Sequence, residues 1–169
     1  SLGLCTTSTN AAQTMGNNSQ PDRFTEFEVS LDTIAKQSTG NARITRDRFE
    51  QLRKLVKSPT ELAILNTYKC EFNRLNNQQS EIEPVLQELN ENISKNLENY
   101  DLRAALELCS FAKESELSAQ ALHVSKAYQF ARFARSASLR FFISSIYIEL
   151  TASQGRASDA VTAAQTVLS

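Results

Sequence analysis

The sequence predicts an all-α protein, an antiparallel bundle of seven to eight helices in a single domain over residues 21–169. From residue 22 onward, apolar residues recur three and four positions apart, which is the spacing of one helix face. The 169 residues include only 4 Gly and 3 Pro, so few positions interrupt this pattern. The connections are short, which makes consecutive helices antiparallel neighbours. Residues 1–20 are mostly small and polar, and we expect them to form a disordered tail.

The first two helices are expected at about 22–38 and 43–57. Asp22 is expected to cap the first helix, and Gly40 is a natural stop after it. Each helix has one apolar stripe: Phe24, Phe27, Leu31 and Ile34 on the first, and Phe49, Leu52, Leu55 and Val56 on the second.

Capping boxes mark the start of the third and fourth helices. In KSPTE, Ser58 can cap, Pro59 suits the first helical position, and Glu61 completes the box of a helix that runs to about 76. Ser80 and Glu83 form a second box before a helix at about 81–98. The apolar stripes are Leu65, Tyr68, Phe72 and Leu75 on the third helix, and Ile82, Leu86, Leu89, Ile93 and Leu97 on the fourth.

The C-terminal part contains the remaining helices. Asp101 is expected to cap the fifth, and the sixth lies at about 118–135. The seventh, at about 137–153, is apolar nearly all round, which is typical of a helix buried among neighbours. A short eighth helix follows Gly155.

The last two helices also carry a resemblance to a known repeat. The segment ISSIYIELTASQGRASDAVTAAQTVL has an aromatic, Tyr147, in the middle of its first helix and small residues on its second: Ala157, Ala160 and Ala164. It resembles a degenerate tetratricopeptide repeat, although it lacks the closing proline. The resemblance implies a second fold alternative, a short α-solenoid of helical hairpins.

The composition argues against several classes of chemistry. The net charge is −1 and the glycines are scattered, so neither general attraction to nucleic acid nor a glycine-rich phosphate loop is indicated. There is one histidine and no C-x-x-C motif, which argues against zinc and redox sites. No isolated Asp or Glu lies in an apolar stripe, where burial would create an acid or base. We therefore expect no enzyme, no catalytic residue, no metal, no cofactor and no specific nucleic-acid partner.

The three cysteines leave two alternatives open. Either all are free thiols, or Cys70 pairs with Cys109 and Cys5 stands apart. Cys109 lies on the apolar stripe of its helix, whereas Cys70 points away from Leu65 and Phe72. A disulfide requires Cα atoms within about 7 Å, so it forms only if the third helix is packed on two sides. The helical wheel therefore favours free thiols.

The start of the chain carries a second resemblance. SLGLC, with the polar run that follows, is similar to the beginning of a bacterial lipoprotein, because Leu2 stands three residues before Cys5. The sequence departs from that family at Leu4, where a small residue is usual. The resemblance implies an extracytoplasmic domain that contacts a membrane only through Cys5. A cytoplasmic location is the alternative.

Charge is separated between two helices. The second is basic through Arg43, Arg46, Arg48, Arg53, Lys54 and Lys57, and the fourth is acidic through Glu81, Glu83, Glu88, Glu91 and Glu98. We expect solvated faces that are complementary neighbours in the bundle. The alternative for the basic helix is contact with an anionic membrane or with phosphates.

The sixth helix carries the candidate partner-binding residues. Tyr128, Arg132 and Arg135 step by four and three positions, opposite an apolar stripe of Leu122, Ala127, Phe130 and Ala134. An exposed row of Tyr and Arg is typical of binding hot spots, although Arg132 could simply stack on Tyr128. His123 lies on the apolar stripe, where we expect a core or interface residue with one hydrogen bond.

The sequence therefore predicts a protein-protein interaction or assembly module, a scaffold or adaptor that recognises proteins by shape and charge and can form a homo-oligomer. One alternative is a carrier that encloses an apolar ligand in a cavity lined by Phe130, Phe133, Phe141 and Phe142. The other is the membrane-anchored, lipoprotein-like domain.

Overall fold

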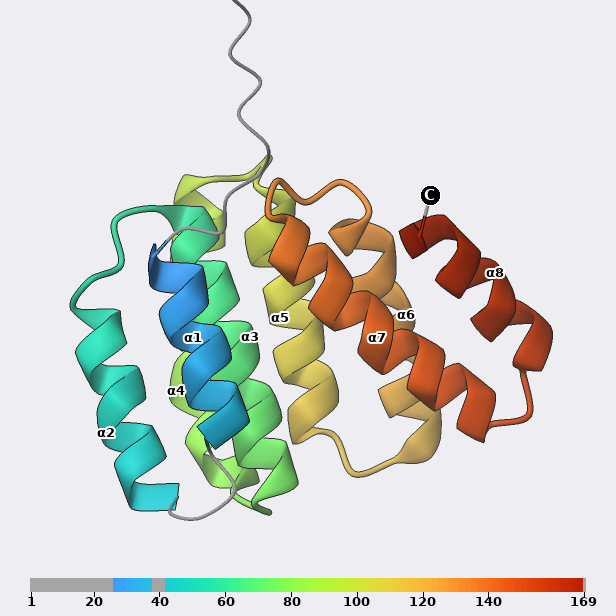
Figure 1. Cartoon of the computed structure of the whole chain (residues 1–169), viewed down its shortest axis with the longest axis horizontal. Helices are drawn as coiled ribbons and strands as arrows, with labels where there is room; N and C mark the ends of the chain where they lie inside the picture. Colours follow the sequence, from blue (N-terminus) through green and yellow to red (C-terminus); the bar gives the residue numbers. More distant parts are fainter. Residues whose placement is uncertain (1–25, 38–41, 169) are drawn as a thin grey trace, which may run out of the picture.

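The computed structural model describes residues 26–37 and 42–168, and over these residues it confirms an all-α bundle without strands (Figure 1). Its elements are α1 (Glu26–Gln37), α2 (Ala42–Arg53), α3 (Pro59–Leu75), a short 3₁₀ helix η1 (Gln79–Ile82), α4 (Glu83–Lys95), α5 (Tyr100–Lys113), α6 (Leu117–Ala131), α7 (Ala137–Ser153) and α8 (Ala157–Leu168). Consecutive α-helices run in opposite directions, so the bundle is antiparallel, as predicted. We call the end at which α1, α3, α5 and α7 begin the upper end, as drawn in Figure 1.

Helix α5 lies at the centre of the bundle, packed against α3, α4 and α6. Burial extends around much of its circumference, because small alanines alternate with leucines and let neighbouring helices approach. Its fully buried residues are Leu102, Ala104, Ala105, Leu108 and Cys109. At the other extreme, α8 packs mainly against α7 and forms one edge of the molecule.

Helix α7 is enclosed on one side only. Leu139 and Ile143 are fully buried, as a core helix requires, but Phe141 is 62% exposed. The reason is that α7 crosses the front of the bundle between α1 and α8, so its outer side has no covering helix among the described residues (Figure 1). The prediction of a helix buried all round is wrong for that side. The tetratricopeptide resemblance stays a prediction, because bundle and solenoid both contain such an antiparallel pair.

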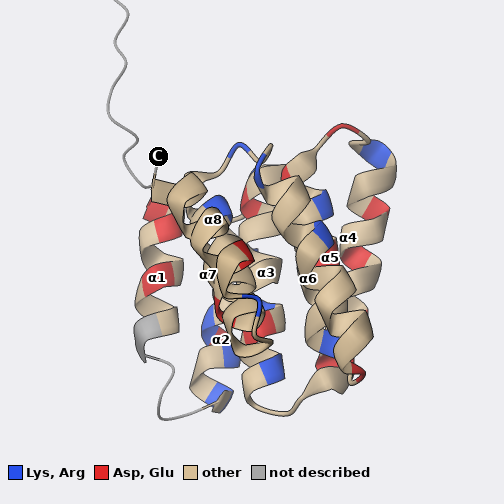
Figure 2. Cartoon of the chain, turned by 90° about the vertical axis from the view of Figure 1, so that its right-hand side faces the viewer, with Lys and Arg blue, Asp and Glu red and all other residues tan. Residues whose placement is uncertain are grey.

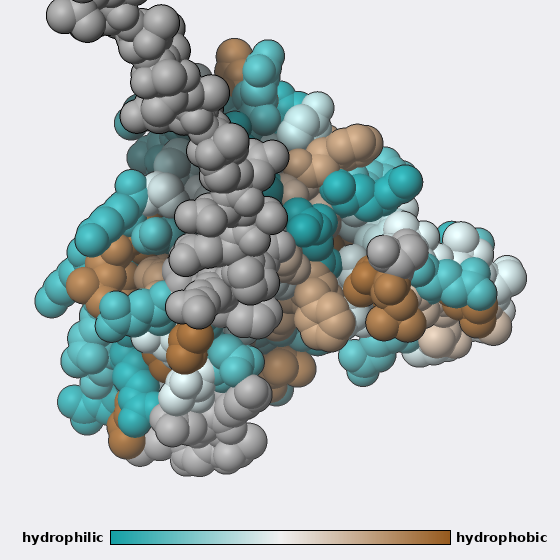
Figure 3. Space-filling model, turned by 45° about the horizontal axis from the view of Figure 1, so that its top comes forward, coloured by the Kyte–Doolittle hydropathy of each residue, from teal (hydrophilic) through white to brown (hydrophobic). Residues whose placement is uncertain are grey.

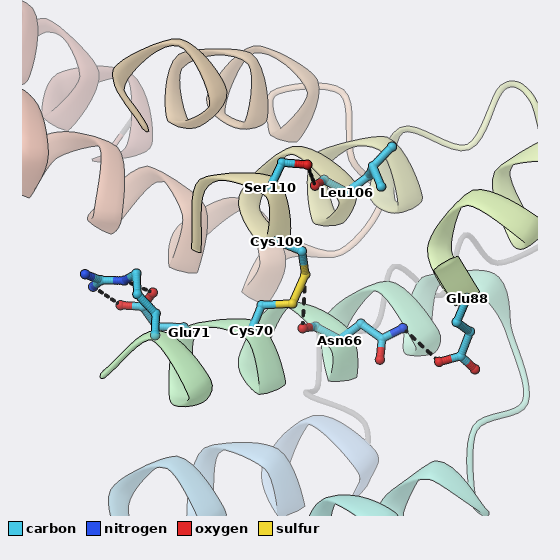
Figure 4. The surroundings of a disulfide bond; sticks show 8 residues. Asn66, Cys70, Glu71, Glu88, Leu106, Cys109 and Ser110 are labelled. Carbon is cyan, nitrogen blue, oxygen red and sulfur yellow. Dashed lines mark hydrogen bonds and ion pairs between the residues drawn. A yellow bond between two sulfur atoms is a disulfide. The ribbon is translucent and has the colours of Figure 1, made fainter. Parts of the chain in front are cut away.

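A disulfide joins α3 to α5 (Figure 4). Cys70 and Cys109 are bonded with their Cα atoms 5.2 Å apart, so the interpretation with three free thiols is wrong. The bond forms because α3 is packed on two sides. Ala63, Thr67 and Cys70 are as fully buried as Leu65 on the other side. The Sγ atom of Cys109 also lies 3.4 Å from the backbone carbonyl oxygen of Asn66.

The two predicted capping boxes have different outcomes. The hydroxyl of Ser58 accepts a hydrogen bond from the backbone N–H of Glu61 at 3.1 Å, which confirms the first cap. The Glu61 carboxylate accepts from the N–H of Lys57 rather than of Ser58. The second box is wrong, because Ser80 lies inside η1 and α4 begins at Glu83 without a side-chain cap. The 3₁₀ turn instead places Ile82 in the core, with none of its surface exposed.

The cap of α5 is Asn99, not Asp101. The Asn99 side-chain oxygen accepts from the N–H of Leu102 at 3.0 Å. Asp101 is 1% exposed and accepts hydrogen bonds from the backbone N–H groups of Arg135 at 3.1 Å and Ser136 at 3.0 Å. The expectation that no isolated carboxylate is buried is therefore wrong for Asp101, whose buried carboxylate joins the start of α5 to the start of α7.

Several sequence predictions lie outside the described residues: the tail over residues 1–20, the anchor at Cys5, the cap at Asp22 and the stop at Gly40. Gly155, between α7 and α8, is described and has a φ of +74°. That left-handed conformation suits glycine and marks the turn expected there.

Candidate interaction cleft

An open cleft of about 1070 Å³ lies along the outer side of α7. α1 and α8 contribute its outer walls, and residues of α3 and of the end of α6 reach it from behind. The apolar part of its lining includes Val29, Ala131, Phe141, Phe142 and Ile146. The cleft exists because α1 and α8 are spaced on either side of α7, which leaves its outer apolar residues in a concavity.

Stacked aromatic rings form the rigid part of this lining. Tyr68 of α3 stacks on Phe142 of α7, with ring centroids 4.3 Å apart. Tyr128 of α6 stacks on Tyr147 of α7, also at 4.3 Å. Offset-stacked pairs of this kind fix both rings, because each ring restricts the rotamers of its partner. Phe141 has no such ring partner within the described residues, and it is the exposed aromatic of the cleft.

Carboxylates of α1 line one wall. Glu28 accepts hydrogen bonds from the hydroxyls of Ser138 at 2.8 Å and Ser136 at 3.3 Å, which ties α1 to the start of α7. Burial, together with the negative charges of Asp32 and Glu28, raises the pKa of Tyr68 above its usual value. Tyr68 is therefore a neutral phenol at physiological pH, and the cleft lining as a whole carries charges of both signs.

The three predicted partner-binding residues do not form one helical row. Tyr128 and Arg132 both line the cleft, but α6 ends at Ala131, so Arg132 and Arg135 belong to the connection to α7. Arg132 and Arg135 are exposed. Tyr128 is half-buried because its ring packs on Tyr147 rather than under Arg132. The predicted apolar stripe is confirmed at Ala127 and Ala134, which are buried, but it is wrong at Leu122, which is exposed; Val124 and Ala131 are buried in addition.

The four phenylalanines expected around one cavity separate into two groups. Phe141 and Phe142 line the cleft. Phe130 and Phe133 instead lie beside Tyr100, with centroid distances of 6.2 Å and 5.5 Å. The division arises because Phe133 follows the end of α6 and turns toward the start of α5.

His123 is half-buried, and its Nδ1 atom lies 2.7 Å from a carboxylate oxygen of Glu107. This contact joins α6 to α5 and agrees with the prediction of an interface residue with one hydrogen bond. It lies away from the cleft lining.

Opposite charges of α2 and α4 meet at Arg53 and Glu88. Arg53 donates from Nε to Glu88 at 2.7 Å, so the predicted complementarity of the two helices holds at this pair. Asn66 donates to the other oxygen of the same carboxylate at 3.3 Å.

The sequence did not reveal Glu28, Asp32 and Tyr68 as members of the cleft. Tyr68 had the periodicity of a core residue, and nothing local shows that α1 stops short of covering it. The acidic residues of α1 were the one available signal, since a helix with carboxylates beside its apolar stripe borders a polar surface.

The described residues contain no cluster of three or more His, Cys, Asp or Glu side chains that could hold a metal ion. Within the same residues, no helix combines the length and apolar character needed to cross a bilayer. No protein family, no curated protein and no solved structure gives a significant match to the sequence. The class defined by fold and cleft is therefore an all-helical bundle with an open, partly aromatic groove.

Proposed function

We propose that the chain is a non-enzymatic protein-binding module, a scaffold or adaptor, that seats an amphipathic helical segment of a partner protein in the cleft along α7. The observation that carries this proposal is Phe141, a large apolar side chain 62% exposed within a concave lining. An apolar helix face laid on Phe141 and Ile146 would bury surface that water now contacts.

The charge of the cleft indicates what else the partner segment carries. The α1 wall is acidic at Glu28 and Asp32, and Glu149 of α7 also faces the cleft. A basic side chain on the partner would complement these groups, and such charges mainly set specificity and encounter rate. Arg132 borders the cleft near the start of α7 and would meet an acidic residue of the partner.

The test is capture of partners from the native source by the chain and by two matched variants. Phe141→Asp places a charge in the cleft, whereas Leu117→Asp does the same at a residue that is 73% exposed and lies outside it. A partner that uses the cleft is retained by Leu117→Asp and lost with Phe141→Asp. A photo-crosslinker at position 141 should then join the chain to an amphipathic, basic segment of that partner. Equal capture by both variants would contradict the proposal.

A carrier of a small apolar ligand is the second candidate. It is favoured by the cleft volume of about 1070 Å³, which is near the upper end of ordinary ligand sites. Native mass spectrometry separates the two functions. A co-purifying lipid mass that Phe141→Asp removes supports the carrier, and a clean mass supports the interaction module. A mass that doubles with concentration would indicate that the partner is a second copy of the chain.

A further inference from the structure

A second apolar surface lies at the upper end of the bundle, outside the cleft along α7. It consists of Leu97, Tyr100 and Phe133, which are 63%, 41% and 66% exposed. We call these three residues the end patch. None of them lines the cleft along α7 or the smaller groove between α1 and α2.

The end patch is held in place by contacts beneath it. Tyr100 lies 5.5 Å from Phe133 and 6.2 Å from Phe130, measured between ring centroids. Arg103 lies over the Phe130 ring and donates to the backbone carbonyl of Leu97 at 2.5 Å. The connections before α5 and after α6 are thereby joined, so the exposed apolar side chains are presented together rather than on independent loops.

Basic residues surround the end patch. Lys95 and Arg103 lie on the α4 and α5 side, and Arg132 and Arg135 lie on either side of Phe133 in the chain. Figure 2 shows basic segments at the upper end, at the end of α4 and in the connection between α6 and α7. Three carboxylates lie nearby. Glu98 is exposed, Glu28 accepts from the hydroxyls of Ser136 and Ser138, and Asp101 is buried and accepts from the backbone N–H groups of Arg135 and Ser136.

Neither Arg132 nor Arg135 is paired with a carboxylate among the described residues, so no ion pair within these residues neutralises either guanidinium charge. Helices both begin and end here, so helix termini add no clear net charge, and the positive charge of this end comes from its Lys and Arg side chains.

The shape of this surface favours a lipid layer over a protein. The apolar side chains come from the connections and from the first turn of α5. Figure 3, in which the upper end comes forward, shows hydrophobic and hydrophilic residues interspersed on this side of the molecule. A helical or extended peptide binds in a groove, whereas an interfacial membrane site needs protruding apolar side chains with basic neighbours. Tyr and Phe at the headgroup level with Arg at the phosphates is the usual composition of such a site.

From this combination we propose that the upper end of the bundle docks on an anionic phospholipid surface, with Leu97 and Phe133 inserted and Arg132 and Arg135 at the phosphates. Helix α1 also begins at this end. Docking would leave the cleft along α7 beside the membrane and open to a partner. The end patch itself lies outside the cleft, although Arg132 borders both surfaces.

The experiment is flotation of the 169-residue chain with vesicles of phosphatidylcholine alone and of phosphatidylcholine with phosphatidylglycerol. We expect binding to the anionic vesicles that weakens as salt rises, because the Debye length shortens. Leu97→Ser with Phe133→Ser should lower the partition coefficient roughly tenfold or more, since both variants remove inserted apolar surface. Arg132→Glu with Arg135→Glu should lower it by a similar factor at low salt.

Matched controls use exposed residues elsewhere. Leu117→Ser with Leu122→Ser removes apolar side chains that are 73% and 55% exposed on α6. Lys126→Glu with Arg156→Glu reverses two exposed charges outside the end patch, on α6 and just before α8. Both controls should bind as the unaltered chain does, and circular dichroism should show unchanged helix content in every variant.

The proposal is overturned if the chain does not bind anionic vesicles, or binds neutral vesicles equally well. It is also overturned if the end-patch variants bind like the controls, or if they lose only a captured protein while vesicle binding persists. The last result would identify the end patch as a protein interface. None of these outcomes affects the Phe141 test of the cleft.

Discussion

Asp101 at the start of α5 accepts a hydrogen bond from the backbone N–H of Ser136, 35 positions later, at 3.0 Å. Ser136 in turn caps α7 by accepting from the N–H of Leu139 at 3.1 Å. One buried carboxylate thus sets where α7 starts relative to the central helix. Because α7 forms the base of the cleft, the position of the cleft depends on this contact.

Replacing Asp101 by Ala should destabilise the bundle by about 2–4 kcal/mol. The substitution removes a charged acceptor and leaves the N–H groups of Arg135 and Ser136 without their partner. Urea unfolding followed by circular dichroism measures the change. Glu98→Gln, on an exposed neighbour, is the control and should shift the free energy of unfolding by less than about 0.5 kcal/mol. A similarly small effect of Asp101→Ala would show that this contact is not needed.

Breaking the disulfide should lower stability by about 4 kcal/mol in the chain-entropy estimate, because Cys70 and Cys109 are separated by 39 residues. The double variant Cys70→Ala with Cys109→Ala is compared with the parent chain in urea, with and without reductant. Cys5→Ser is the control and should leave the transition unchanged. Thiol titration of the unreduced, denatured chain should find a single free thiol, and three free thiols would contradict the bond.

Glu88 should matter more than its ion-pair partner Arg53. The Arg53 side chain is 42% exposed, so Arg53→Ala should cost about 0.5–1 kcal/mol. Glu88→Ala should cost about 1–3 kcal/mol, because it also removes the acceptor of the fully buried Asn66 side chain, whose oxygen has no partner among the described residues. A double-mutant cycle measures the coupling of Arg53 and Glu88. Equal costs for the two single variants would show that the Asn66 contact contributes nothing.

The raised pKa of Tyr68 predicts a loss of stability at high pH. Burial and the nearby charges of Asp32 and Glu28 raise its folded-state pKa above the ordinary value of 10.0. A group whose pKa is raised on folding contributes stability that is fully present below its unfolded pKa and is lost as pH rises through its folded pKa. Ultraviolet titration of tyrosinate should therefore show a late-ionising component. Tyr68→Phe should remove that component, while Tyr100→Phe should leave it in place.

The helices themselves could be predicted from the sequence because helix formation depends mainly on residues that are close together in the chain. Ser58 and Glu61 lie within one turn, and the periodic apolar residues of α3 to α7 depend only on neighbours three and four positions away. The choice between Asn99 and Asp101 as cap could not be made this way. Both residue types suit the position, and what decides it is a partner more than thirty residues along the chain.

The cleft and the disulfide could not be predicted from the sequence for a related reason, because both depend on how the helices pack against one another. A helical wheel identifies the most apolar side of a helix, but not how many sides are covered. The helical wheel therefore placed Cys70 on an outer face of α3, but that face is buried in the structure. It placed Phe141 in a helix expected to be buried, but the side chain is exposed. Tyr128 and Arg132 were predicted as surface residues and do line the cleft, whereas Arg135 does not, because the chain leaves the helical path after Ala131.

The position of α8 at the edge of the bundle has a consequence for motion. A helix that packs mainly on one neighbour unfolds locally at lower cost than a helix enclosed on several sides, so its amide hydrogens exchange earlier. Amides of α8 should accordingly exchange before those of α5, which the disulfide also restrains. Because Thr166 and Val167 of α8 line the cleft, each such opening would widen it, and an occupant touching both α7 and α8 would slow their exchange.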